Sequence, residues 1–215
     1  MEGFQLSVRA VIKQAERGAL QGILGPVSRL IQADASCALA IETALGAAAQ
    51  NLICEREEDA KKGIRYLSET KGGRATFLPI SALKPKNLQE NGLDSCAGFV
   101  GIASDLITSD PKYRGVVENL LGRTVIVENI DNAISMAKRY GNRFKIVTLD
   151  GQVMNPGGSM TGGSVNKEAG ILSRANELEK LTEQEKQTLA ETFSDRALFR
   201  SVFEGAEGNA LPEVY

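Results

Sequence analysis

A glycine-rich stretch at residues 149–164, LDGQVMNPGGSMTGGS, is the part of this sequence whose residue types and spacing could bind a ligand. Residues 157–164 have the spacing of a phosphate-binding loop, in which backbone amides hold phosphate oxygens. Such a loop needs a lysine before its final serine to pair with the phosphates, and Gly163 stands there instead. The missing ammonium disfavours a nucleotide site, which is nevertheless the first of three interpretations of this segment.

Two further interpretations follow from the glycines themselves. The pairs Gly157–Gly158 and Gly162–Gly163 come after Asp150–Gly151, a hairpin signal. Dense glycine marks unusual backbone angles, or a place where another backbone or a ligand approaches closely. The segment is then either a flexible surface loop or a place where two chains meet and pair exposed strand edges.

The remaining candidate chemistry is sparse. The 215 residues contain no histidine, so the commonest general base and a frequent metal ligand are missing. Cys37, Cys54 and Cys96 form no C-x-x-C pair, and we interpret them as buried hydrophobic residues. The adjacent acids Glu57 and Glu58 suit the start of a helix, and no nucleophile beside a base is identifiable. We therefore expect no enzyme activity, no cofactor and no metal.

Charge and hydropathy limit the partners. Lysine and arginine total 25 against 27 acids, so the net charge of -2 favours neither nucleic acid nor a membrane surface, and any DNA contact must be a local patch. The first residues lack the apolar core of a signal peptide, and no uncharged apolar run approaches the roughly 20 residues of a membrane span. We expect a soluble cytoplasmic protein with no membrane partner.

Helical periodicity appears near both ends of the chain. Apolar residues recur at steps of three and four in two stretches, at Phe4, Val8, Val11 and Ala15, and at Ile171, Ala175, Leu178 and Leu181. The polar residues Gln5, Arg9 and Lys13 separate the first set. Two amphipathic helices therefore flank a central globular region.

The central region reads as two similar units. Each begins with a helix ending in Glu-x-x-Leu-Gly, at Gly46 or Gly122, where glycine suits a left-handed helix cap. Each continues with a short apolar strand, an amphipathic helix opened by acids and closed by bases, and a second strand. These elements are expected at residues 51–54, 57–71 and 75–80 in the first unit, and 124–127, 131–139 and 144–149 in the second. The sequence predicts two β-α-β units related by an internal repeat, or two ordinary units that resemble each other by coincidence.

The stretch between the two units contains turn signals around a β-prone run at residues 98–103, which predicts a linker with an added strand. Pro111 suits the first turn of the next helix, with Asp110 as its N-cap.

Basic residues gather at the matching helices of the two units. We take them as candidate DNA contacts, although bases near a helix C-terminus also stabilise the helix dipole while remaining solvated. They are Lys61, Lys62, Arg65, Lys71 and Arg74 in the first unit, and Lys138, Arg139, Arg143 and Lys145 in the second.

Four segments in this order resemble the hinge domain of bacterial structural maintenance of chromosomes (SMC) proteins: GILGPVSRLIQAD, AIETALGAAAQNLIC, LLGRTVIVENIDNAISMA and FKIVTLDGQVMNPGGSMTGGS. The resemblance extends over residues 18–173. It implies an α/β (mixed α+β) fold, in a ring-shaped homodimer whose sheets continue across two symmetric interfaces. It also places the glycine-rich segment at those interfaces, with the candidate contacts Gly157, Gly158, Ser159, Met160, Thr161, Gly162, Gly163 and Ser164.

The resemblance also implies an organisation along the chain. Residues 1–17 are expected to be the stub of an incoming coiled-coil helix, 18–108 and 109–169 the two hinge subdomains, and 170–190 the stub of the outgoing helix. The ATPase heads of the family, built from distant chain ends, are absent from this sequence. Arg29 departs from an acid that many relatives carry. Glycines and a proline in residues 191–215 interrupt the expected heptads, so the resemblance assigns no role to that tail.

The function expected from the resemblance is homodimerisation that joins two coiled-coil arms in a nucleoid-associated chromosome segregation protein, with weak sequence-independent binding to DNA. The alternative is a small-molecule-binding α/β domain or an enzyme that uses the glycine-rich loop.

Overall fold

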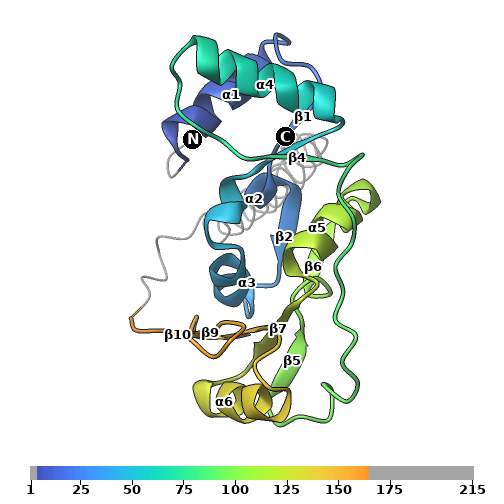
Figure 1. Cartoon of the computed structure of the whole chain (residues 1–215), viewed down its shortest axis with the longest axis vertical. Coiled ribbons are helices and arrows are strands. Elements are labelled where there is room, and N and C mark those ends of the chain that lie inside the picture. Colours follow the sequence, from blue (N-terminus) through green and yellow to red (C-terminus); the bar gives the residue numbers. More distant parts are fainter. Residues whose placement is uncertain (1–3, 165–215) are drawn as a thin grey trace, which may run out of the picture. The chain divides into compact units, whose positions relative to one another are not determined.

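The computed structural model describes residues 4–164, which all lie in a unit spanning residues 1–176. Helices alternate with short strands, and the strands form three sheets, which confirms the α/β class (Figure 1). The predicted helix around residues 171–181, the outgoing coil and the tail lie outside the described residues.

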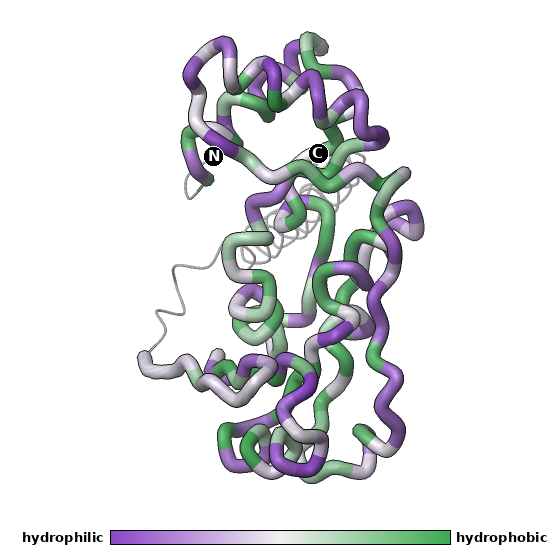
Figure 2. Tube along the Cα trace, viewed as in Figure 1, coloured by the Kyte–Doolittle hydropathy of each residue, from purple (hydrophilic) through white to green (hydrophobic). Residues whose placement is uncertain are grey.

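The first β-α-β unit consists of β3 (Leu52–Cys54), α4 (Glu57–Glu69) and β4 (Phe77–Pro79), with β3 and β4 parallel as predicted. Strand β1 (Ile23–Pro26) pairs antiparallel with β3, so the sheet has the order β1-β3-β4. Three acids in the first turn of α4 suit the positive end of the helix dipole. Figure 2 shows both polar and apolar stretches along this helix.

The second unit, β7 (Thr124–Val127), α6 (Ile130–Arg139) and β8 (Lys145–Thr148), repeats this arrangement with β7 and β8 parallel. Its sheet is longer. Strand β5 (Phe99–Ile102) lies antiparallel to β7, and β8 is followed by β9 (Val153–Met154) and β10 (Met160–Thr161), in the order β10-β9-β8-β7-β5. Both predicted β-α-β units are therefore confirmed. The predicted basic end is confirmed for α6 but was wrong for α4, which ends at Glu69 with no base in its last turn.

A third sheet joins segments that are distant in sequence. Strand β2 (Ile31–Ala33), which follows the short helix α2 (Val27–Leu30), pairs antiparallel with β6 (Ile107–Ser109). Around it lie α3 (Ala38–Leu45), the 3-10 turns at Gly46–Gln50 and Pro111–Tyr113, and α5 (Arg114–Leu121). One hydrophobic core extends through these elements into both other sheets, since it contains residues such as Ile41, Ile53, Leu121 and Ile126.

Helix α1 (Leu6–Glu16) confirms the predicted N-terminal helix. Val8, Val11 and Ile12 are buried in a cluster with Leu52 of β3 and Leu67 of α4, and Phe4 and Ala15 pack against this cluster. The apolar side of α1 therefore packs on its own domain. Its assignment to a coiled-coil stub stays a prediction.

Three local predictions have clear outcomes. The strand expected at residues 98–103 is β5, but it pairs with β7, although the predicted subdomain boundary at residue 108 grouped it with the first unit. Asp110 does cap the turn at Pro111–Tyr113, because its carboxylate accepts a hydrogen bond from Lys112 N at 2.9 Å. The left-handed cap was wrong at Gly122, whose φ is −67°; there a side chain would instead overlap the Lys86 carbonyl oxygen. At Gly46 φ is 51° but ψ is −128°, outside the left-handed helical region, although the positive φ still favours glycine.

Candidate dimerisation site

Strand β10 forms one edge of the five-stranded sheet. It pairs on one side with β9, through Met160 with Met154 and Thr161 with Val153. Residues 156–164 are all exposed, and Met160 is one of the few large apolar side chains at the surface of the described residues, at 53% exposure. An exposed edge strand offers unpaired backbone groups to a further strand.

The glycine-rich segment is held in a defined conformation by backbone hydrogen bonds. Gly157 N donates to Asn142 O at 2.9 Å, and Gly158 N donates to Asn155 O at 3.0 Å. Asn155 N donates to Ser159 O at 2.8 Å, which closes the turn between β9 and β10. These bonds favour an ordered hairpin over the flexible-loop interpretation.

The four glycines serve different purposes within the chain. Gly157, Gly158 and Gly163 have φ angles of 86°, 94° and 139°, which residues other than glycine rarely adopt. An added Cβ at Gly157 or Gly163 would meet no atom of the chain within 4 Å. At Gly162 it would overlap the side-chain oxygen of Gln152. Space therefore lies open beside Gly157 and Gly163, whereas the Gln152 side chain fills it beside Gly162.

The same hydrogen bonds weigh against the phosphate-loop interpretation. In such a loop several successive amides point at the anion. Here the amides of Gly157, Gly158 and Gly163 donate to Asn142 O, Asn155 O and Gln152 Oε1. Three donors that a phosphate would require are therefore used within the chain.

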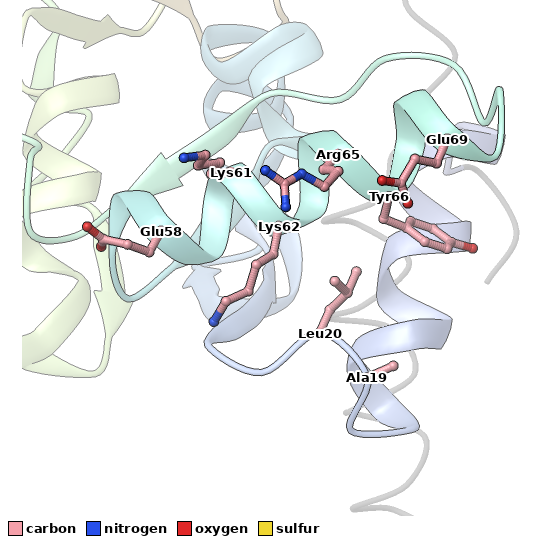
Figure 3. Close-up of a pocket in the computed structure, with 8 residues that line it drawn as sticks. All are labelled: Ala19, Leu20, Glu58, Lys61, Lys62, Arg65, Tyr66 and Glu69. Atoms are coloured by element: carbon pink, nitrogen blue, oxygen red, sulfur yellow. The ribbon is translucent and has the colours of Figure 1, made fainter.

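The predicted bases of the first unit lie on and after α4. Lys61, Lys62 and Arg65 are exposed and line an open cavity of about 450 Å³ together with Ala19, Leu20, Glu58, Tyr66 and Glu69 (Figure 3). Lys62 is paired with Asp59, whose carboxylate lies 3.0 Å from Nζ and is largely buried, at 12% exposure. Lys71 and Arg74 follow the end of α4 and are also exposed. The cavity rim is thus mixed in charge, with its cations on one helix.

The predicted bases of the second unit lie on and after α6. Lys138, Arg139 and Arg143 are exposed. Arg139 Nη1 donates to Cys96 Sγ at 3.3 Å, and Lys145 Nζ donates to the Ala44 carbonyl at 3.2 Å. Because α4 packs against the three-stranded sheet and α6 against the five-stranded one, the two groups occupy separate elements.

The cysteines and the paired acids have structural environments. Cys37 and Cys54 are buried as predicted, but Cys96 is half-buried, so the prediction was wrong there, because Cys96 lies in the linker next to α6. Burial, with Asp59 nearby, raises the pKa of Cys54 to about 11. The Ser81 hydroxyl donates to Glu57 at 2.5 Å and lowers the pKa of that carboxyl. Within residues 4–164 no group of three or more His, Cys, Asp or Glu side chains is placed to hold a metal ion.

Two further observations bear on expectations from the sequence. Arg29 is the departure from the family pattern. Its Nη1 lies 3.8 Å from Oε1 of Glu16 in α1, and its Cζ lies 5.4 Å from the centre of the Phe4 ring. Among the described helices, none combines the length and apolar character that crossing a bilayer requires.

Sequence reasoning missed the polar residues that hold the glycine-rich segment, namely Asn142, Thr148, Gln152 and Asn155. The residue type of Asn142 was one usable signal, because its φ is 54° and asparagine tolerates such positive values better than most residues. The residue type of Gln152 gave no signal, since its hydrogen-bond partner Gly163 is 11 positions away.

Comparison with known proteins places this geometry in a family. The family model for the SMC proteins' flexible hinge domain matches residues 20–137. The chromosome partition protein Smc of Bacillus subtilis is 46% identical over 186 residues, which cover 85% of this chain and 16% of the relative. The Smc protein of Halothermothrix orenii is 41% identical, again over 16% of its length. The chain therefore spans about one sixth of the curated relatives it matches.

Solved structures agree with the sequence comparison. A crystal structure of an asymmetric dimer of the Geobacillus stearothermophilus SMC hinge domain matches with a TM-score of 0.85 and 38% identity, over 95% of this chain and 83% of that one. The Pyrococcus furiosus SMC hinge domain matches with a TM-score of 0.61 and 34% identity, over 76% and 92% of the two chains. The predicted resemblance is confirmed: with its two β-α-β units and its glycine-rich edge, the chain belongs to the SMC hinge domain family.

Proposed function

We propose that this chain is the homodimerisation module of a chromosome partition SMC protein and joins two coiled-coil arms. The observation that carries the proposal is β10, an exposed edge strand bordered by glycines beside which the chain leaves open space. An incoming strand gains backbone hydrogen bonds along such an edge. In the proposed dimer, residues 157–164 meet a second copy of the chain.

Several features support a second copy of this chain as the partner. The segment is ordered before any partner binds, so little conformational entropy is lost on association. Met160 supplies an apolar contact on an otherwise polar, glycine-rich stretch. The matching Geobacillus stearothermophilus hinge domain is described as an asymmetric dimer.

The proposal assigns this chain a connecting role in a longer, cytoplasmic, nucleoid-associated protein. In that protein residues 1–17 and 170–190 lead into the coiled-coil arms, and ATP hydrolysis belongs to parts of the protein outside this chain. The hinge itself has no enzymatic function in this proposal and needs no cofactor.

The oligomeric mass of two matched variants tests the proposal. Wild type is expected to elute as a dimer at micromolar concentration in size-exclusion chromatography with light scattering. Met160→Lys places a charge in the proposed interface and is expected to shift the mass toward a monomer. Ile64→Lys is the control, because Ile64 on α4 is an equally exposed apolar residue, at 56%, outside that segment. A monomeric wild type, or equal behaviour of the two variants, would refute the proposal.

A second proposed activity is weak, sequence-independent DNA binding. Lys61 and Arg65, exposed at the cavity beside α4, support it. Lys62 contributes less, because the Asp59 carboxylate already neutralises it. Binding through phosphates requires that affinity fall steeply as salt is added. A binding constant that does not depend on ionic strength would exclude this activity.

A further inference from the structure

Gln152 is fixed to the centre of the five-stranded sheet by its backbone. It follows the tight turn after β8, where Gln152 N donates to Thr148 Oγ1 at 2.9 Å and Thr148 N donates to Gln152 O at 2.9 Å. Thr148 is fully buried, and its hydroxyl also donates to the Asp150 carboxylate. The position of Gln152 is therefore set by the core.

From this position the Gln152 side chain reaches the glycine-rich segment. Gly163 N donates to Gln152 Oε1 at 2.8 Å, and Gln152 Nε2 donates to Gly163 O at 3.2 Å. Together these bonds reproduce the two-bond exchange between opposite residues of antiparallel strands. The carboxamide thus acts as a substitute strand residue for Gly163.

Gly162 makes this contact possible. Its φ is not positive, so backbone angle does not require glycine there. A Cβ at Gly162 would occupy the place of Gln152 Oε1, so the absence of a side chain admits the carboxamide. Gly162 therefore has a role inside the chain, which differs from the interface role expected from the sequence.

The contact lies where the sheet itself offers little support. The ladder between β9 and β10 contains two residue pairs and ends at Thr161. Beyond Thr161, the Gln152 side chain holds the backbone against the sheet through Gly163. Without it, the segment has to be ordered again at the moment of association, and ordering lowers affinity.

We infer that Gln152 is a positioning residue for self-association: it holds Gly162–Gly163 in the conformation in which β10 receives a second copy of the chain. The inference rests on the proposed homodimer and adds the residue that prepares its edge.

The experiment compares wild type with Gln152→Ala, Gln152→Glu and the control Gln89→Ala, a glutamine that is exposed in the linker. The dimer dissociation constant is measured by sedimentation, and amide exchange of Gly163 by NMR. Gln152→Ala is expected to raise the dissociation constant about tenfold, through the loss of both hydrogen bonds to Gly163 on each chain, and to speed Gly163 exchange. Gln152→Glu keeps an acceptor for Gly163 N, so exchange there should stay slower than in Gln152→Ala. The melting temperature of Gln152→Ala should stay close to that of wild type, which shows that the variant is folded. Gln89→Ala should match wild type in the dissociation constant and in Gly163 exchange.

The outcomes separate the two proposals. A dimeric wild type whose dissociation constant is unchanged in Gln152→Ala overturns the role of Gln152 and leaves homodimerisation in place. Unchanged Gly163 exchange in Gln152→Ala overturns the role of Gln152 as well. A wild type that is monomeric at every concentration overturns both.

Discussion

A pair of glycine substitutions separates the proposed interface role of Gly157 from simple backbone strain. Gly157 and Gly18 have similar φ angles, 86° and 77°. At both, an added Cβ would meet no atom of the chain within 4 Å. Gly157→Ala and Gly18→Ala therefore impose the same kind of change on the folded chain, but only Gly157 lies in the proposed interface.

The expected magnitudes follow from these angles. Holding alanine in the left-handed region costs about 1–2 kcal/mol, and in a domain of this size each kcal/mol lowers the melting temperature by about 2–4 °C. Both variants should show this loss. At Gly157 the methyl group also occupies space that a second chain would use, so we expect the dimer dissociation constant to rise at least tenfold, about 1.4 kcal/mol, while Gly18→Ala leaves it unchanged.

Two measurements decide the comparison. Thermal unfolding by circular dichroism reports the strain, and sedimentation over a dilution series reports the dissociation constant. If both variants weaken the dimer equally, strain explains the effect and the interface reasoning is wrong. If neither weakens it, the second copy does not approach Gly157.

Three further predictions concern other parts of the molecule. Ile126→Ala truncates a fully buried residue of β7 and should lower the free energy of unfolding by about 2–5 kcal/mol in urea titrations, whereas Val100→Ala, at an exposed edge position, should change it by less than about 1 kcal/mol. Cys54 should resist alkylation at pH 8 while half-buried Cys96 reacts, because a thiol with a pKa of about 11 holds little thiolate. The raised pKa also makes the free energy of unfolding depend on pH: its contribution is present below about pH 9 and should be lost as the pH rises toward 11. Cys54→Ala should abolish this loss. Arg65→Glu should weaken DNA binding and lower the salt slope by about 1, whereas the same change at exposed Arg123, between α5 and β7, should not; equal effects would point to net charge alone.

Much of the local structure was predictable because it repeats along the chain. Buried strands of β-branched and other apolar residues, such as Thr124–Val127, and the acid-to-base order of the following helix are properties of neighbouring residues. The N-terminal helix was predictable for the same reason, since its buried residues recur with helical spacing. The glycine-rich segment was conspicuous by composition alone.

The sequence by itself thus determined the two β-α-β units, the N-terminal helix and the presence of an unusual backbone near Pro156, because each depends on periodicity or residue type within a short window. Only the tertiary structure decided that β5 joins β7, that Gly122 makes room for the Lys86 carbonyl, and that Gln152 fills the space beside Gly162. These contacts join residues between 10 and 36 positions apart, by shape and by hydrogen bonds to backbone atoms. Every residue has a backbone carbonyl, and every residue except proline has an amide N–H. The residue types alone therefore do not reveal which carbonyl or amide a distant side chain will contact.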